Sequence, residues 1–409
     1  MKRTGTPGDE RHPVRRTLLY SHDTFGLGHL RRSRTIATAL VDAGVTGSAL
    51  IVTGSPIAGR FDFPPCVDHV RLPGVVKHAD GSYTSSNLRM DIDEMVALRG
   101  SLIEAVERDF HPDLVIVDKE PWGFRGELAG TLAALRDRGA RIVLGLRDVL
   151  DEEDALAEEW ARKNALEAIE GFYDEIWVYG LPEVNRPLAG LGLSRRMEAR
   201  VTYTGYLRRE LPDWPAESAG EVPEKPYVLV TTGGGGDGAA LIDWVLRAYE
   251  SDPGLEPRAL MIYGPFLQAA ERAGFDRRVA ALGDRVTALA FHSRVERLLA
   301  EACGIVSMGG YNTFCEILSM DRPAIICPRV KPREEQRIRA AAAERLGLAR
   351  MLLPARDGEG AEVMAAAIRG LERQPRPSEV RIAGLLDGLE TIATRAGGPP
   401  PPRLAVAGG

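Results

Sequence analysis

A loop near the amino terminus holds a histidine and two glycines in a pattern that suits proton transfer beside an anion or a sugar. It runs from Ser21 to Arg32 and contains Gly26, Gly28 and His29. The glycines permit tight backbone turns, and backbone amides at the start of a helix can face an anion. A histidine such as His29 can act as a general base near neutral pH; the alternative is that it caps or positions the loop.

Arg31 and Arg32 follow in the first turn of the expected helix, where positive charge opposes the helix dipole. This placement indicates either an anionic ligand or two solvated arginines. Arg31 also stands where the dinucleotide fingerprint G-x-G-x-x-G needs its third glycine, so the loop does not predict NAD binding.

A second loop, from Thr231 to Gly238, has four adjacent glycines, Gly234 and Gly235 among them. Such a run lets the backbone approach a ligand where side chains would clash. The loop lacks the Lys-Ser/Thr pair of a P-loop, so a kinase or an ATPase is disfavoured.

A third loop leads into a helix that we expect to begin near Asn312. Gly309 and Gly310 precede this helix, and amides at its start could bind a diphosphate. Glu316 lies one turn into the helix, on the same face as Asn312 and Thr313. A carboxylate at that place can accept two hydrogen bonds from ribose hydroxyls, although a glutamate on a helix is also ordinary.

Acidic residues elsewhere offer fewer signals. Asp118 and Glu120 follow a strong strand pattern and are a second source of a general base, or part of an ordinary polar turn. The acidic run 151–154 opens an expected helix over 155–170, where negative charge suits the helix dipole, so it is interpreted as structural. Three cysteines are interpreted as buried thiols rather than metal ligands: Cys303, Cys315 and Cys327. Neither a metal nor a cofactor is predicted.

The elements that carry these loops alternate between short aliphatic runs and longer amphipathic stretches, the pattern of βαβ units. The predicted class is α/β, with two Rossmann-like doubly wound halves. The strands expected in the first half are Thr17–Tyr20, Ala49–Val52, Leu114–Val117, Arg141–Leu144, Glu175–Val178 and Val201–Thr204. Those in the second half are Tyr227–Thr231, Leu260–Tyr263, Val286–Leu289, Gly304–Ser307 and Ala324–Cys327. Because ligands bind near the carboxyl ends of strands in such sheets, we expect the two halves to face a central cleft.

The length of 409 residues exceeds what one hydrophobic core usually supports, so two domains are expected. The predicted boundaries are a flexible tail at 1–16, an acceptor domain at 17–205, a linker at 206–226, a nucleotide-sugar domain at 227–377, a helix at 378–396 that could pack back on the first domain, and a disordered tail at 397–409.

The composition is that of an ordinary globular protein, with 44% hydrophobic and 27% charged residues. A net charge of −6 gives no reason to expect nucleic acid as a partner. The basic, polar start of the chain lacks the apolar run of a signal peptide, and no apolar stretch is long enough to span a bilayer. A cytoplasmic location is therefore expected.

Taken together, the three loops in this order resemble the GT-B glycosyltransferases of the MurG type, which transfer N-acetylglucosamine from UDP to a lipid-linked acceptor. The chain looks still more like the bacterial predicted glycosyltransferases related to that group. The resemblance covers most of residues 17–395 and is strongest from Phe291 to Gln336. It implies an inverting, metal-independent hexosyltransferase that moves a sugar, such as an N-acetylhexosamine, from a UDP-sugar to a hydroxyl in glycan, glycolipid or cell-envelope synthesis.

The resemblance also implies roles for single residues. The stretch 290–294 would touch the uracil, the Gly309–Thr313 loop would hold the diphosphate, and Glu316 would bind the ribose. Gln336 matches the family's sugar-binding glutamine, whereas Glu335 and Arg339 replace the histidine and asparagine of the family's His-Gln-x-x-Asn-Ala motif. The predicted site comprises the catalytic residues His29, Asp118 and Glu120, the donor-binding residues Gly28, Gly234, Gly235, Phe291, His292, Ser293, Gly309, Gly310, Tyr311, Asn312, Thr313, Glu316 and Gln336, and the acceptor-side residues Arg31 and Arg32.

The Gly-His-x-x-Arg form of the first loop also looks like the nucleotide-sugar hydrolases of the pseudaminic acid pathway, in which the histidine acts on water. Hydrolysis, 2-epimerisation of a nucleotide sugar and non-catalytic binding on the same fold therefore stay open. The expected partners are a UDP-sugar donor and a glycan or lipid-linked acceptor. A lipid acceptor would add peripheral contact with the inner face of the cytoplasmic membrane.

Overall fold

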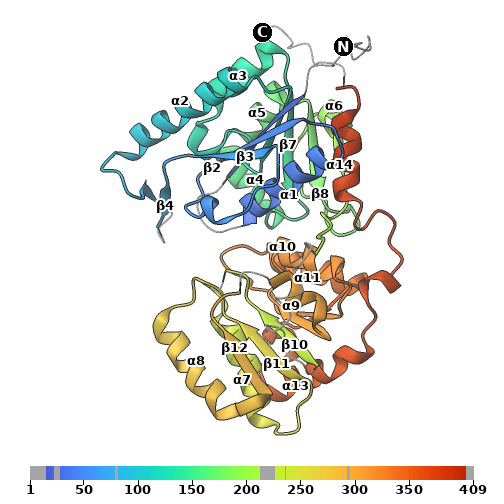
Figure 1. The fold of residues 1–409 in the computed structure, drawn as a ribbon. Helices are drawn as coiled ribbons and strands as arrows, with labels where there is room; N and C mark the ends of the chain where they lie inside the picture. Colours follow the sequence, from blue (N-terminus) through green and yellow to red (C-terminus); the bar gives the residue numbers. More distant parts are fainter. Residues whose placement is uncertain are drawn as a thin grey trace, which may run out of the picture. The chain divides into compact units, whose positions relative to one another are not determined.

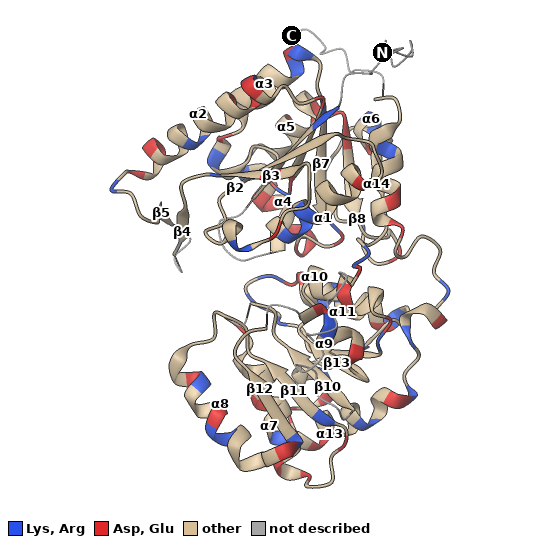
Figure 2. Ribbon diagram, viewed as in Figure 1, with Lys and Arg blue, Asp and Glu red and all other residues tan. Residues whose placement is uncertain are grey.

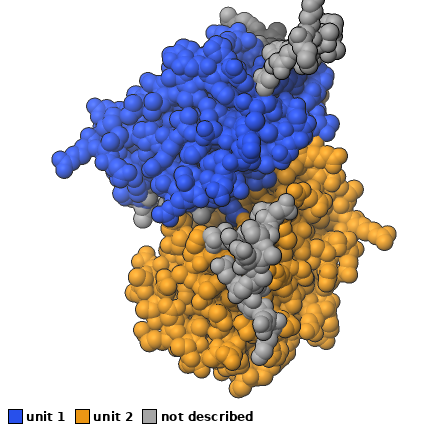
Figure 3. Space-filling view, in the orientation of Figure 1, with its two compact units in different colours: residues 1–145, 165–176, 392–409 blue, residues 146–164, 177–391 orange. Residues whose placement is uncertain are grey.

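The computed structural model describes residues 15–22, 28–78, 82–211, 226–234, 236–292 and 295–401. It divides into two compact units, one of residues 1–145, 165–176 and 392–409, the other of residues 146–164 and 177–391 (Figure 3). Most of both predicted tails and residues 212–225 of the predicted linker lie outside the described residues. The first residues of that linker are packed, since Tyr206 and Leu207 are fully buried.

Seven strands form the first sheet in the order β3-β2-β1-β6-β7-β8-β9. Figure 1 shows strands of this sheet with helices around them. Their bounds are β1 Arg16–Ser21, β2 Ser48–Thr53, β3 Val67–Arg71, β6 Leu114–Asp118, β7 Arg141–Arg147, β8 Glu175–Tyr179 and β9 Val201–Tyr203. The pairings of β1 with β2 and β6, of β2 with β3 and of β6 with β7 are parallel. Every residue of β6 and β8 is buried, as expected for aliphatic strands covered on both faces by helices.

The helices in this part of the chain are α1 Gly28–Asp42, α2 Ile92–Phe110, α3 Ala129–Arg138, α4 Glu153–Arg162, α5 Ala165–Phe172 and α6 Arg195–Glu198. The single helix predicted over 155–170 is wrong, because α4 and α5 are separated at Asn164, whose φ is 50°. Asparagine is one of the few residues that enter this left-handed region readily. Glu152 caps α4 by accepting from the amides of Asp154 and Ala155, which supports the structural interpretation of the acidic run.

Six strands form the second sheet, β12-β11-β10-β13-β14-β15, and all their pairings are parallel. They are β10 Tyr227–Thr231, β11 Arg258–Ile262, β12 Val286–Leu289, β13 Gly304–Ser307, β14 Ala324–Ile326 and β15 Arg350–Met351. The helices are α7 Ala239–Ser251, α8 Ala269–Leu282, α9 Val295–Glu301, α10 Tyr311–Ser319, α11 Glu335–Arg345, α12 Pro354–Asp357 and α13 Ala361–Gly370. One core cluster packs α7 and α13 against β10, β11 and β13 through side chains such as Trp244, Val306 and Ile368.

Each sheet has a switch in its strand order at one strand. In the first sheet β1 has β2 on one side and β6 on the other, and in the second β10 lies between β11 and β13. In doubly wound sheets, the connections that leave the two neighbouring strands at such a switch run to opposite faces, and ligands bind outside the carboxyl ends of these strands. The predicted catalytic residues follow β1 and β6, and two predicted donor loops follow β10 and β13.

Two further features differ from the sequence prediction. An antiparallel hairpin before α2, β4 Val75–Lys77 with β5 Tyr83–Ser85, lies where no strand was predicted. The predicted helix 378–396 is shorter, because α14 spans only Gly388–Gly397. A φ of 73° at Gly384 interrupts helical geometry before it. Within the described residues, no helix has both the length and the apolar character needed to cross a membrane.

Candidate active site

The core of the candidate site is a histidine held by a buried carboxylate. His29 lies in the first turn of α1, after the carboxyl end of β1, and Asp118 is the last residue of β6. The distance from His29 Nδ1 to Asp118 Oδ2 is 2.5 Å, and their side chains are 18% and 5% exposed. Because a carboxylate can only accept, we assign the proton of this hydrogen bond to Nδ1. That tautomer leaves Nε2 as the basic nitrogen of a neutral His29.

Arg32 completes this arrangement from inside the protein. Its Nη2 donates to both carboxylate oxygens of Asp118 at 2.6 and 2.7 Å, and its side chain is 2% exposed. Burial alone would raise the pKa of Asp118, yet the charges of Arg32 and His29 hold this pKa well below its usual range. Arg32 was predicted on the acceptor side; the structure shows it as a buried partner of Asp118, and a contact with the acceptor stays a prediction. Arg31, one residue earlier, is only partly buried, and the basic character of α1 is visible in Figure 2.

A second histidine lies beside the first, and it was not among the residues predicted from the sequence. The rings of His22 and His29 meet edge to face with centroids 5.9 Å apart. Burial, with the nearby charge of Lys119, holds the pKa of His22 well below its usual range, so its ring is neutral at pH 7. Its Nδ1 has no hydrogen-bond partner in the part of the chain that is described. The sequence signal that could have identified His22 is its position directly after β1, the strand at the switch point of the sheet.

Glu120, the third residue predicted to be catalytic, forms an ion pair with the lysine beside it. Its Oε1 pairs with Lys119 Nζ at 3.0 Å, and Glu120 is 7% exposed. Lys119 has a φ of 72°, a left-handed conformation that costs a lysine about 1 kcal/mol or more. The backbone is therefore strained within the charged cluster formed by Asp118, Lys119 and Glu120 at the end of β6. Within the cluster, Asp118 and Glu120 are both bound to cations, which leaves His29 as the better candidate for the base.

The glycine loop after β10 is packed against the loop after β11. Gly264 has a φ of 87°, and a Cβ there would lie 2.7 Å from the Gly233 carbonyl oxygen. The Phe266 amide donates to the Gly234 carbonyl at 3.0 Å, and the Phe266 ring lies against Gly234. Because these glycines have no side chains, the two loops can approach each other closely, in addition to the access that glycines give a ligand. Gly235 lies outside the described residues.

The third loop leads from β13 into α10, so a helix starts where the sequence predicted one. Gly309 has a φ of 72°, and a Cβ there would meet Ile326 Cγ2 at 2.5 Å, so only glycine fits. Gly310 is at the N-cap position of α10, which begins at Tyr311. Backbone amides at this helix start can bind phosphate oxygens. Glu316, one turn further, is 3% exposed.

Two residues at the start of α11 line the same edge of the second sheet. Arg329 follows β14 and contacts Asp237 of the glycine loop at 3.3 Å and Glu335 Oε1 at 2.5 Å. The Gln336 carboxamide accepts from the Arg329 amide at 3.1 Å. Glu335 is 4% exposed, and its buried Oε2 has no partner among the described residues. From the sequence, Glu335 was only a departure from the family motif.

The remaining predicted donor residues are distributed as follows. Phe291 follows β12 and is 60% exposed, His292 is next to it, and Ser293 lies outside the described residues. Asn312 Oδ1 accepts from Arg209 Nη2 at 2.9 Å, while Thr313 is partly buried. Gly28 opens α1 in the first unit with His29. All the other predicted donor residues that the structure describes belong to the second unit.

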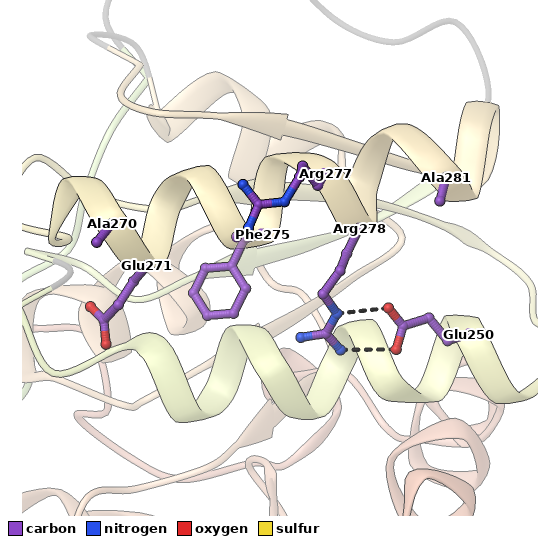
Figure 4. A pocket seen from close by; sticks show the side chains of 8 residues that line it. Glu250, Ala270, Glu271, Phe275, Arg277, Arg278 and Ala281 are labelled. Carbon is purple, nitrogen blue, oxygen red and sulfur yellow. Dashed lines mark hydrogen bonds and ion pairs between the residues drawn. The ribbon is translucent and has the colours of Figure 1, made fainter.

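No other part of the described chain competes with these loops as a chemical site. No group of three or more potential metal ligands occurs among the described residues, and the four cysteines are free. A surface groove between α7 and α8 is lined by Phe275, Arg278 and Glu250 (Figure 4). Arg278 donates to Glu250 at 2.7 and 2.9 Å, so the charges of these two side chains neutralise each other. None of the predicted site residues lines this groove.

The second half of the chain matches the glycosyltransferase family 28 C-terminal domain over residues 228–373. A comparison with the curated proteins gives no match.

Solved structures similar to nearly the whole chain include CalG4, the calicheamicin glycosyltransferase, at a TM-score of 0.58 and 17% identity, over 94% of this chain and 97% of that one. Acinetobacter baumannii MurG has a TM-score of 0.56 and 13% identity, over 93% and 99%. Phytolacca americana UGT2, complexed with UDP-2-fluoro-glucose and pterostilbene, has a TM-score of 0.61 and 15% identity, over 94% and 95%.

These similarities confirm the predicted fold class, GT-B with two Rossmann-like domains. The similar structures show the GT-B fold, and the glycosyltransferase family 28 domain marks the chain as a glycosyltransferase, which confirms the predicted enzyme class. The similar structures include MurG and also glycosyltransferases of other kinds. The fold therefore does not single out the MurG type.

Proposed function

We propose that the protein transfers a sugar from a UDP-sugar to an acceptor hydroxyl with inversion at the anomeric carbon and without a metal. The observation that carries this proposal is the His29 ring held through Nδ1 by buried Asp118 at the switch point of the first sheet. A neutral imidazole oriented by a carboxylate is a general base suited to a hydroxyl nucleophile.

In the proposed reaction, His29 Nε2 takes the proton of the acceptor hydroxyl as its oxygen attacks the anomeric carbon. The bond from that carbon to the phosphate oxygen breaks, and UDP leaves with the electron pair. Asp118 stabilises the imidazolium that forms. Backbone amides at the start of α10 stabilise the negative charge on the leaving diphosphate, and because they are fixed in place they need little reorganisation.

The donor would be held by residues of the second unit. Gly309, Gly310 and Thr313 would bind the diphosphate, Glu316 the ribose, and the segment around Phe291 the base. Glu335 and Gln336 would face the sugar, and the buried Oε2 of Glu335 supports a donor that offers hydroxyl groups to it. The similar UGT2 structure is a complex with UDP-2-fluoro-glucose, which also favours UDP as the nucleotide.

The acceptor, the cytoplasmic location and the peripheral membrane contact stay predictions. So does a role in cell-envelope synthesis, together with the boundaries 17–205 and 227–377 for the acceptor and donor domains. MurG is among the similar structures, and this likeness supports a glycan or lipid-linked acceptor as the first to test.

The test is product analysis of purified protein incubated, without added metal, with UDP-, GDP- and dTDP-sugars, each with and without a lipid or cell-extract acceptor. Release of UDP only when acceptor is present supports transfer and identifies the donor sugar. Release of UDP and free sugar without acceptor would replace transfer by hydrolysis, with His29 activating water. A mass-neutral change of the sugar, seen by NMR, would instead indicate an epimerase. Absence of all three reactions with every donor would refute the proposal.

A further inference from the structure

A buried ion pair lies directly behind the loop proposed to bind the diphosphate. Arg339 is on α11 and Asp148 follows β7, and both side chains are 0% exposed. Arg339 donates from Nε and Nη2 to the two carboxylate oxygens of Asp148 at 2.7 and 2.6 Å. Both residues belong to the second unit.

Arg339 has a third interaction that reaches the loop itself. Its Nη1 donates to the Gly309 carbonyl oxygen at 3.0 Å, and its guanidinium lies 5.7 Å from the centroid of the Tyr311 ring. Gly309 is the residue with φ 72°, and Tyr311 opens α10. The Gly309 carbonyl and the Gly310 N–H share one peptide plane, so this hydrogen bond fixes the direction of the Gly310 amide at the start of the helix.

Asp148 is held as firmly on its other side. The Tyr206 hydroxyl donates to Asp148 Oδ2 at 2.8 Å, and Asn185 Nδ2 donates to the Asp148 carbonyl at 3.1 Å. A Cβ at Gly180 would lie 2.5 Å from the Asp148 Cβ, so the backbone there approaches closely. These contacts hold the Asp148 carboxylate in one position, and its two hydrogen bonds orient the Arg339 guanidinium.

The energetics show why this pair requires a functional explanation. Desolvation of two charges commonly cancels their attraction, and apolar residues of similar shape often give equal or greater stability. An apolar pair could fill this space, but it could not donate a hydrogen bond to the Gly309 carbonyl. Only the charged pair supplies the hydrogen bond from Arg339 Nη1 to the Gly309 carbonyl.

We infer that Arg339, oriented by Asp148, is a positioning residue for the Gly309 loop and so for the diphosphate of the donor. The inference rests on the proposed function, because it assumes that the loop binds the diphosphate. It also assigns a role to a residue where this chain departs from the family motif. Arg339 does not contact the sugar; it supports the loop from within the protein.

The test compares UDP and uridine binding, by calorimetry and by NMR titration, in wild type and in the double variant D148L/R339M. The double variant removes both charges together, so neither is left buried and unpaired. We expect UDP affinity to fall at least tenfold and uridine affinity to stay within about twofold, because only UDP uses the loop. In turnover, the donor KM should rise while the acceptor KM stays unchanged.

The matched control is R99M/E127L. This pair is equally buried, at 2% and 0% exposure, and is bidentate, but it lies in the first unit. It should leave both affinities unchanged. If the double variant fails to fold, R339K replaces it; its single ammonium cannot reach both Asp148 oxygens and Gly309, and the same selective loss of UDP affinity is expected.

The outcomes separate the two proposals. Wild-type protein that binds no UDP would refute the proposed function itself. Wild-type protein that binds UDP, with a folded variant of equal UDP affinity, would overturn the positioning role alone. Equal losses for UDP and uridine would also overturn it, since they would show general damage rather than a misplaced loop.

Discussion

Replacing Asp118 by asparagine is the sharpest test of the proposed base. The carboxylate accepts from His29 and from Arg32 at once, at 2.5 to 2.7 Å. A carboxamide has one accepting oxygen and a donating NH2 group, so it cannot satisfy both partners. If it accepts from Arg32, its NH2 group faces His29 Nδ1 and favours the tautomer that protonates Nε2. The base would then carry the proton it must take.

The size of the effect follows from this geometry. In the Ser-His-Asp triad the same substitution lowers kcat by about 10⁴-fold through the wrong tautomer. We expect a loss of about 10³- to 10⁴-fold in kcat for D118N, with UDP affinity unchanged. Arg32 would lose its charged partner, and breaking a buried ion pair costs about 3–5 kcal/mol of folding free energy. The variant should therefore be assayed at low temperature, after its folded fraction has been measured.

Glu175→Gln is the matched control. Glu175 pairs with Arg141 at the amino ends of β8 and β7, and their side chains are 3% and 8% exposed. His29 lies at the other end of this parallel sheet, where the strands have their carboxyl ends. The E175Q variant should therefore lose a similar amount of stability and keep its kcat. A folded D118N variant with kcat within threefold of wild type would refute the dyad. Equal kcat losses in D118N and E175Q would assign the effect to stability alone.

Three further predictions use the same structure. The pKa of Asp118 is held below its usual range, so its stabilising contribution is complete above about pH 5 and is lost progressively below about pH 4, as the pH approaches the depressed pKa. In urea unfolding, the difference in stability between wild type and D118N should be constant above about pH 5 and should shrink steadily in more acidic buffer. G309A places a Cβ 2.5 Å from Ile326 and should lower UDP affinity more than tenfold in calorimetry. Burial raises the pKa of the Cys327 thiol, so a thiol reagent should label exposed Cys66 quickly and Cys327 only after denaturation.

The strands and the two-sheet class were predictable because apolar runs of four to six residues leave few alternatives. β10 and β13 coincide with the predicted ranges 227–231 and 304–307. β3, in contrast, was missed, since its sequence Val-Asp-His-Val-Arg alternates weakly and only β2 beside it makes it a strand. The break at Asn164 was missed for a related reason, because nothing in a helical pattern forbids a left-handed asparagine.

The candidate site was predictable where one short segment carries the information. His29 and Asp118 were selected as alternative bases because each follows a strand, but their contact joins residues 89 positions apart and depends on the β1–β6 pairing. The burial of Arg32 was not predictable, because an arginine in a first turn usually faces solvent. The Arg32 side chain points inward because Asp118 lies buried beside it, and only the folded structure shows this neighbour.

The two departures from the family motif on α11 have different consequences. At 339 the change from asparagine to arginine would suggest altered sugar recognition, yet the side chain is wholly buried and occupied by Asp148 and Gly309. At 335 the change from histidine to glutamate leaves a buried oxygen without a partner in the described chain, at the edge where the donor loops meet. An unpaired carboxylate oxygen is costly unless a ligand hydroxyl satisfies it. Sugar choice is therefore expected to follow Glu335, and E335Q should change the ratio of kcat/KM between UDP-sugars, whereas R339K should lower kcat/KM for all of them alike.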